Sequence, residues 1–203
     1  MLIDNVSYLS LNTQQLNEAK QIAENGGMNG LLIKDVLLQE ASTLNQNKRV
    51  YPKEILIREV QKYTDNFINQ KAAYGELDHP ETPTIRLKEV CHMIPKVYWN
   101  GNKLYGDLNI LDTPNGRIVE AILRAGGRIG ISSRAMGSTK KITNEGESFD
   151  QVEEDLELCG WDCVSNPSVL KASFMLQEGL DKNIEVINRY KKINYYIQKI
   201  LRN

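Results

Sequence analysis

The sequence lacks the many cysteines of small secreted domains and the long apolar runs of membrane-spanning proteins. It contains three cysteines among 203 residues, an odd and low number that argues against a disulfide scaffold. Cys159 and Cys163 on one strand would lie roughly 13 Å apart, too far to bridge. No apolar run approaches the length of a membrane span, and residues 1–10 lack the pattern of a secretory signal. These absences predict a reduced, intracellular protein.

Positive and negative charges nearly balance, with 25 Lys and Arg against 26 Asp and Glu. The formal net charge is -1, which gives no whole-protein attraction to nucleic acid or to a membrane surface. Hydrophobic residues make up 41% and charged residues 25%, as in an ordinary globular protein of one domain. Only two histidines occur, His79 and His92, so a mechanism that needs an imidazole has two candidates.

The periodicity of apolar residues divides the chain into three regions. Residues 1–29 are rich in Asn, Gln and Gly and are expected to form an arm or a loosely packed helix. Residues 30–175 predict an α+β domain, with strands near 31–38, 85–99, 103–111, 129–136 and 151–164 and helices near 52–67 and 118–123. Residues 176–203 carry a heptad-like apolar stripe and predict a basic amphipathic helix.

The strand predicted at 129–136 presents a candidate nucleophile. Alternate residues of a strand share a face, so Gly130, Ser132 and Arg134 lie on the face opposite Ile129 and Ile131. The isoleucines predict the core side. Ser132 therefore points outward, and Gly130 leaves room beside it for a substrate backbone. A serine beside a glycine in a strand is also common without any catalytic role.

The segment Gly75 to Pro80 supplies a candidate base. A serine hydroxyl becomes an effective nucleophile when a base takes its proton, and neutral imidazole suits that task. His79 precedes Pro80, which favours an extended backbone at the histidine. Glu76 and Asp78 lie at odd separations from His79 and should face away from it. The plain alternative is a surface turn with a solvated histidine.

A third group usually orients the base. Asp162 lies on the apolar face of the strand predicted at 151–164, where a carboxylate needs a partner. An imidazole N–H would serve, and backbone donors or an arginine would serve equally well. For the oxyanion of the intermediate, the expected donors are the Ser133 backbone N–H and the Arg134 side chain.

At this point the sequence resembles the prohead core proteases of T-even-type tailed phages, which belong with the herpesvirus assemblin-like serine proteases. The resemblance is carried by Asn45 to Leu56, by Gly75 to Pro80, by Gly130 to Ser138 and by Trp161 to Ser168, and it covers roughly residues 31–168. It implies that 30–175 is a protease domain built as a mostly antiparallel β-barrel flanked by helices. Ser132 takes the place of the nucleophile and His79 that of the base. Herpesvirus relatives have a second histidine after the serine, whereas here His92 precedes it and Asp162 is the favoured third member.

The resemblance also implies a biological role without a cofactor or a metal. Such enzymes assemble with the scaffold as inactive precursors inside the prohead, in the host cytoplasm, where a homo-oligomer is one expected form. They then cut scaffold or core proteins, the major capsid protein and themselves, after glutamate in an apolar-x-Glu context. In this chain Leu176-Gln177-Glu178 fits that pattern, so cleavage after Glu178 is expected to release the basic C-terminal helix. The cations available to hold a glutamate are Arg128, Arg134, Lys140 and Lys141.

Three other interpretations compete with the serine protease. A capsid assembly module would keep the fold without the activity. A metal-dependent hydrolase would use His79, Asp78 and Glu76, but their spacing matches no known ligand motif. A cysteine nucleophile would be Cys91 or Cys163, both in apolar strand-like contexts where a free thiol is usually packing.

Overall fold

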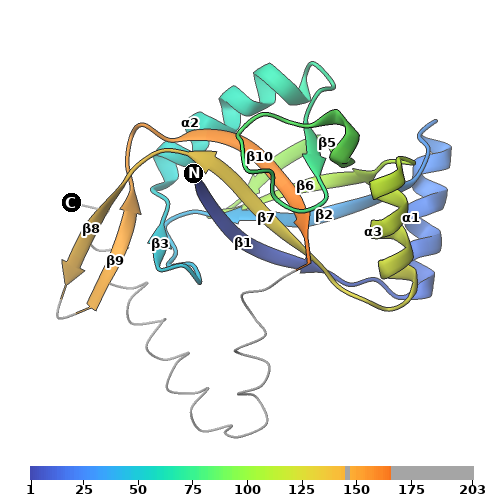
Figure 1. Cartoon of the computed structure of the whole chain (residues 1–203), viewed down its shortest axis with the longest axis horizontal. Helices are drawn as coiled ribbons and strands as arrows, with labels where there is room; N and C mark the ends of the chain where they lie inside the picture. The colour runs from blue at the N-terminus through green and yellow to red at the C-terminus, as the bar shows by residue number, and fades with distance from the viewer. Residues whose placement is uncertain (145–146, 166–203) are drawn as a thin grey trace, which may run out of the picture.

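The strands and helices of the chain form an α+β structure in which most strand pairs are antiparallel (Figure 1). The computed structural model describes residues 1–144 and 147–165. In chain order the strands are β1 (Leu2–Leu9), β2 (Leu31–Glu40), β3 (Arg49–Val50), β4 (Tyr74–Glu76), β5 (Val90–Asn100), β6 (Lys103–Ile110), β7 (Ile129–Met136), β8 (Thr139–Asn144), β9 (Glu147–Val152) and β10 (Glu157–Val164). The helices are α1 (Thr13–Asn25), α2 (Lys53–Tyr63) and α3 (Pro114–Arg124).

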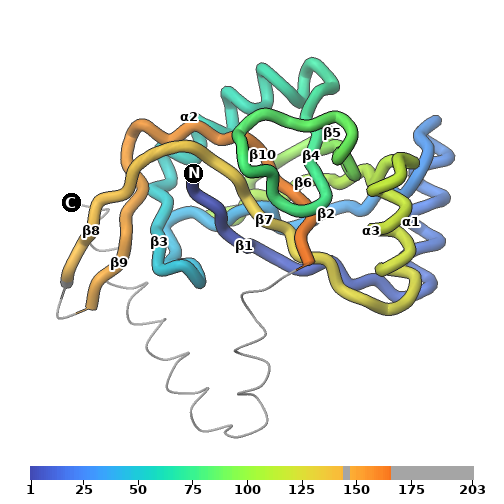
Figure 2. The backbone as a smooth tube through the Cα atoms, in the orientation of Figure 1, coloured from blue at the N-terminus to red at the C-terminus, as the bar shows by residue number. Residues whose placement is uncertain are grey.

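The first sheet has the order β1-β7-β10, so β7 is paired on both sides. Its residues alternate as the sequence predicts. Ile129, Ile131 and Ser133 face the second sheet, while Ser132 and Arg134 project from the opposite face. The tube in Figure 2 shows β1 and β10, from the two ends of the described chain, on either side of β7.

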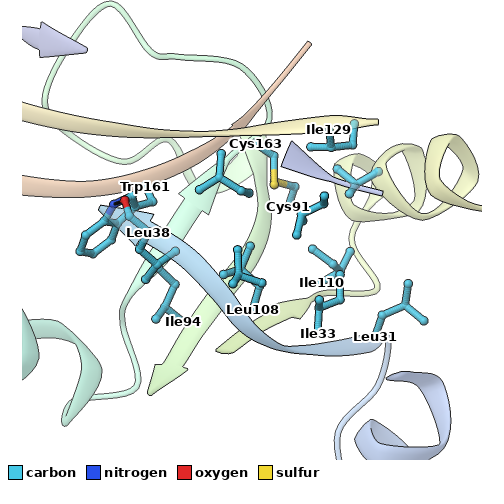
Figure 3. Close-up of a cluster of buried hydrophobic side chains, with 14 of the residues drawn as sticks. Leu31, Ile33, Leu38, Cys91, Ile94, Leu108, Ile110, Ile129, Trp161 and Cys163 are labelled. Atoms are coloured by element: carbon cyan, nitrogen blue, oxygen red, sulfur yellow. Dashed lines mark hydrogen bonds between the residues drawn. The ribbon is translucent and has the colours of Figure 1, made fainter. Parts of the chain in front are cut away.

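The second sheet has the order β2-β6-β5-β4 and packs against the first. The hairpin between β5 and β6 turns at Asn100-Gly101-Asn102, as predicted, and Gly101 has a φ of 60° that favours glycine. The fully buried apolar side chains between the two sheets include Leu31, Leu38, Leu108, Ile110 and Trp161 (Figure 3). The Trp161 indole N–H donates to the Leu38 carbonyl at 2.5 Å, which ties β10 to β2.

The α+β class is confirmed, but the described strands do not close into the predicted barrel. They form three separate sheets, the third with the order β3-β9-β8. The outer strands β1 and β2 meet through a side-chain hydrogen bond, from the Ser7 hydroxyl to the Leu37 carbonyl, and not through a ladder. Bulges in both sheets, as between Asn5 and Ser7, redirect the strands so that the sheets stack face to face. Similarity to the herpesvirus fold remains a prediction.

The helices form where the sequence predicts them, with more regular ends. Thr113 caps α3 by accepting a hydrogen bond from the Gly116 N–H, and Pro114 occupies the first turn. The expected helix over 52–67 begins at Lys53 and continues past Tyr63 as one π-helical turn, Thr64–Ile68. A single 3-10 turn, Leu87–Glu89, delays the strand expected from residue 85 until Val90. No helix in the described part of the chain is long and apolar enough to cross a membrane.

The N-terminal region packs more closely than the sequence predicts. Residues 1–29 were expected as an arm or loosely packed helix, but β1 is a full partner of β7 and α1 buries Leu16, Ala19 and Ala23. The polar composition suggested loose packing because much of α1 is solvent-exposed. Its narrow apolar stripe is nevertheless enough to pack the helix against the rest of the protein. The strand expected over 151–164 is in fact β9 and β10 with a turn between them. The C-terminal region 176–203 lies outside the described residues.

Candidate active site

Ser132 lies at the centre of the first sheet. In the strand register it faces Asn5 of β1 on one side and Asp162 of β10 on the other. Because directly opposite residues project from the same face of a sheet, Asn5, Ser132 and Asp162 form one row across it. The strand pairing fixes this row, and the burial of Ile129 and Ile131 on the other face fixes which way Ser132 points.

His79 reaches this row from the loop after β4. Leu77 makes an isolated parallel bridge with Cys163, and the Asp78 N–H donates to the Cys163 carbonyl at 2.7 Å. Asp78 has a φ of 62°, a left-handed conformation that turns the chain sharply. The next residue is His79, so these contacts with β10 aim the imidazole over the sheet beside Asp162. The side chain of His79 is 18% exposed.

A continuous chain of hydrogen bonds joins the three predicted residues. His79 Nε2 lies 2.8 Å from Ser132 Oγ, and His79 Nδ1 lies 2.9 Å from Asp162 Oδ2. With the ring proton on Nδ1, the imidazole donates to Asp162 and accepts from the Ser132 hydroxyl. The expected meeting of His79 and Ser132, 53 residues apart in the chain, is therefore confirmed.

Asp162 is fully buried and has more partners than the histidine alone. Its Oδ1 accepts from the Glu76 backbone N–H at 3.0 Å, and the Arg134 Nε donates to its Oδ2 at 2.9 Å. Burial raises the pKa of Asp162, but the hydrogen bonds from His79 and Arg134 outweigh that effect, so its pKa lies below the ordinary value. The carboxylate stays charged, and it is held by the imidazole, a backbone donor and an arginine together.

Arg134 does not have the role expected of it. Its guanidinium is fully buried and is committed to Asp162 and to the Pro83 carbonyl, which accepts from Nη1 at 2.6 Å. An arginine held in this way neutralises the buried carboxylate and also fastens the loop that carries His79. It is therefore not free to stabilise an oxyanion or to bind a substrate glutamate.

The ion pair between Glu76 and Arg86 is the part of the site that the sequence did not predict. Glu76 is fully buried, and its carboxylate accepts from the Arg86 backbone N–H at 2.6 Å and from the guanidinium at 2.9 and 3.0 Å. This pair closes the loop between β4 and β5. A glutamate on the apolar side of a short strand was the only available signal, because nothing in the sequence says which of many cations would pair with it.

Ser133 and Gly130 also lie in the middle strand. The Ser133 hydroxyl faces the core, donating to the Asp4 carbonyl and accepting from Gln39, each at 3.4 Å. Its backbone N–H runs within the sheet toward a neighbouring strand, as strand geometry requires, and not toward the face of Ser132. Gly130 is buried between Tyr8 and Val164 in the register, two residues from Ser132 on the same face.

The remaining histidine and two cysteines lie together in the core. His92 Nδ1 is 3.3 Å from Cys91 Sγ and 3.5 Å from Cys163 Sγ, and all three residues are fully buried. Among the described residues this is the group whose ligand atoms, all within 4.8 Å of one another, could hold a metal ion. The set proposed for a metal hydrolase is not assembled, because Glu76 pairs with Arg86 and Asp78 is exposed. All three cysteines are free.

The nucleophile candidate itself is buried. Ser132 has a relative exposure of 0%, although its hydroxyl is hydrogen-bonded to a partly exposed histidine. A polypeptide substrate reaches Ser132 Oγ only if the groups around it move. The geometry needed for proton transfer is thus present in a state that is closed to a substrate.

Serine hydrolases act with a hydroxyl, an imidazole and a carboxylate that are hydrogen-bonded in this order. Here an α+β fold holds the same three groups. A family model for the prohead core protein serine protease matches residues 7–182, and the chain belongs to that family.

Two relatives extend the comparison. The chain is 35% identical over 142 residues to the prohead core protein protease of Enterobacteria phage T4, a match that covers 68% of this chain and 65% of that protein. The matched region thus spans slightly less than two thirds of the relative. The fold is similar to the solved structure of the bacteriophage T4 capsid assembly protease, gp21, with a TM-score of 0.63 and 27% identity over 82% of this chain and 97% of the other.

Proposed function

We propose that this protein is a serine endopeptidase of prohead maturation, with Ser132 as nucleophile, His79 as general base and Asp162 as the group that orients the base. The observation that carries the proposal is the unbroken hydrogen-bond chain from Ser132 Oγ through His79 to Asp162. Membership of the prohead core protein serine protease family supports the same assignment.

The mechanism follows from this geometry. Ser132 Oγ attacks the substrate carbonyl carbon while His79 Nε2 takes the hydroxyl proton, and the carbonyl π electrons move to oxygen. Collapse of the intermediate restores the carbonyl and breaks the C–N bond, and His79 delivers its proton to the leaving amine. Water then repeats the sequence on the acyl-enzyme. Asp162 is charged because its pKa is lowered. Its carboxylate accepts the hydrogen bond from His79 Nδ1–H and stabilises the imidazolium.

The substrates in this proposal are scaffold or core proteins and the major capsid protein, cut after glutamate. A groove of about 630 Å³ lies beside the site, between α2, the loop of residues 83–87 and the start of β10. Phe67, Leu87 and Leu158 give it apolar walls, and Pro83 links it to Arg134 and the catalytic row. It supports recognition of an extended segment with an apolar residue. Of the four cations predicted for the glutamate, Arg134 is committed to Asp162, which leaves Arg128, Lys140 and Lys141.

The buried nucleophile supports an inactive precursor. Because Ser132 is covered although its base is in place, the described state fits an enzyme that waits inside the prohead, in the host cytoplasm, before it is opened. Self-cleavage after Glu178 would remove 25 residues, since 203 minus 178 is 25. Mass spectrometry of the incubated protein tests this step, and a C-terminus that stays intact while scaffold is cut would refute it.

The same burial also favours a second candidate, a capsid assembly module that keeps the fold and never cuts. Coexpression with the scaffold protein of the same phage separates the two. We expect scaffold fragments with the parent and with Ser10→Ala, a control on an exposed serine, and none with Ser132→Ala or His79→Ala. Circular dichroism shows whether each variant is folded. Unchanged processing by folded Ser132→Ala would leave the assembly module as the function.

A further inference from the structure

The active-site geometry leaves the oxygen of the tetrahedral intermediate without an obvious donor. Serine hydrolases place hydrogen-bond donors where this negative charge develops. The two expected donors are otherwise engaged, because the Ser133 N–H is directed along the sheet and Arg134 is held by Asp162 and the Pro83 carbonyl. Another residue beside Ser132 is therefore the place to look for a donor.

The strand register points to one side chain. Asn5 on β1 is directly opposite Ser132, just as Asp162 is on β10. Opposite residues of an antiparallel pair have Cβ atoms about 5 Å apart and project from the same face. The Asn5 carboxamide is therefore within reach of an oxygen on the carbon that Ser132 Oγ attacks.

Asn5 also lies on the side of Ser132 where a donor to the oxyanion is required. His79 bridges Ser132 to Asp162 on the β10 side, and it must deliver a proton to the leaving amine there. The oxyanion then has to lie away from the imidazole. In this sheet the side away from His79 is the β1 side, where Asn5 is the residue next to Ser132.

A local irregularity of β1 marks the same position. The register shifts between Asn5 and Ser7, so Val6 is the extra residue of a β-bulge opposite the serine. Bulges are frequent beside active sites, where they redirect a side chain. Asn5 and Val6 are partly exposed, whereas Asp4 and Leu9 on the same strand are buried.

We propose that Asn5 is a catalytic residue whose side-chain N–H donates to the oxyanion of the tetrahedral intermediate. The inference rests on the proposed endopeptidase function. As Ser132 Oγ bonds to the carbonyl carbon and its proton passes to His79 Nε2, the carbonyl oxygen gains the π electron pair, and Asn5 Nδ2–H stabilises that charge. When the C–N bond breaks, the carbonyl reforms and the hydrogen bond weakens.

The test compares variants that differ in donor capacity at position 5. Asn5→Asp keeps the shape but removes the donor, Asn5→Ala removes the group, and Asn5→Thr restores a hydroxyl donor. For a peptide from the scaffold cleavage site, we expect kcat to fall about 10²- to 10³-fold in Asn5→Asp and Asn5→Ala, as when one oxyanion donor is lost. KM should change little, and Asn5→Thr should recover part of the rate.

A peptide aldehyde of the same sequence gives a second measurement. It forms a tetrahedral adduct with the serine, so Asn5→Asp should weaken its inhibition by about the same factor as kcat/KM. Ser10→Ala, a change at an exposed serine just past the end of β1, is the control and should keep the parent rate. Thermal unfolding shows that each variant is folded.

The outcomes separate this inference from the proposed function. If Ser132→Ala is inactive but Asn5→Ala and Asn5→Asp retain kcat within threefold, the oxyanion role of Asn5 is overturned and the protease remains. If folded Ser132→Ala cleaves at the parent rate, the protease mechanism and the role of Asn5 fall together.

Discussion

Asp162 lies directly opposite Ser132 in the β7–β10 ladder, and His79 spans the two from a separate loop. The sheet register therefore fixes the distance between Ser132, the proposed nucleophile, and Asp162, the proposed orienting carboxylate, while only His79, the proposed base, depends on a loop. Two of the three groups are held by backbone pairing along whole strands. The position of His79 therefore depends on the contacts that fasten the loop of residues 77–89.

The first prediction concerns Asp162→Asn. The amide keeps the shape but no longer holds the imidazole in the tautomer that accepts from Ser132, and losses of about 10⁴ in kcat follow from such a change in other serine proteases. We expect a loss of about 10³- to 10⁴-fold in cleavage of a scaffold peptide. Asp112→Asn, an exposed partner of Arg117, is the control. A kcat within tenfold of the parent would show that Asp162 does not orient the base.

The second prediction concerns acid stability. The pKa of Asp162 in the folded protein lies below its ordinary value of 3.8, since the hydrogen bonds from His79 and Arg134 outweigh the effect of burial. A depressed pKa adds stability that is present above the unfolded value and is lost as pH falls toward the folded one. Urea unfolding between pH 6 and pH 3 should therefore show a shallower loss in Asp162→Asn than in the parent. Equal slopes would contradict the lowered pKa.

The third prediction concerns Arg134→Leu. This change leaves the Asp162 carboxylate buried with one charged partner removed, and breaking a buried ion pair costs about 3–5 kcal/mol. The matched control is Arg117→Leu, which removes an exposed pair with Asp112 and should cost far less, because solvent screens an exposed ion pair. The free energy of unfolding in urea measures both. Similar values for the two variants would mean that the buried pair is not needed for stability.

The fourth prediction concerns the loop itself. Arg86→Ala removes the guanidinium that grips buried Glu76 and should let the His79 loop shift. Because a displacement of about 1 Å at a catalytic group can cost 10²-fold, we expect kcat to fall by about that factor. Lys88→Ala, in the same loop but with a side chain that is largely exposed, should keep the parent rate. Equal activity of the two variants would show that the Glu76–Arg86 pair does not position His79.

Ser132 and Asp162 could be predicted because the patterns that indicate them lie within single strands. Alternation along 129–136 placed Ser132 on the outer face, and an acid on an apolar face pointed to Asp162. The proximity of His79 came from resemblance alone. A bridge between Leu77 and Cys163 that aims the histidine is a contact across 86 residues, and no spacing rule encodes it.

The errors have a common physical origin. Arg134 was expected to help the Ser133 N–H hold the oxyanion, but its guanidinium binds the buried carboxylate of Asp162, which lies on a different strand. The first 29 residues looked loosely attached because they are rich in Asn, Gln and Gly, yet β1 pairs with β7 along its whole length. Closure into a barrel depends on how bulges redirect strands, which hydrophobic patterns do not report.

The position of β7 between β1 and β10 has a consequence for synthesis of the protein. The strand that carries Ser132, β7, pairs with β1, the first strand of the described chain, and with β10, the last one. A ribosome must therefore release the chain beyond Val164 before Asp162 can join Ser132 and His79. Chains that end before β10 cannot form the hydrogen-bond chain of Ser132, His79 and Asp162, so this arrangement appears only after nearly all of the described chain has been made.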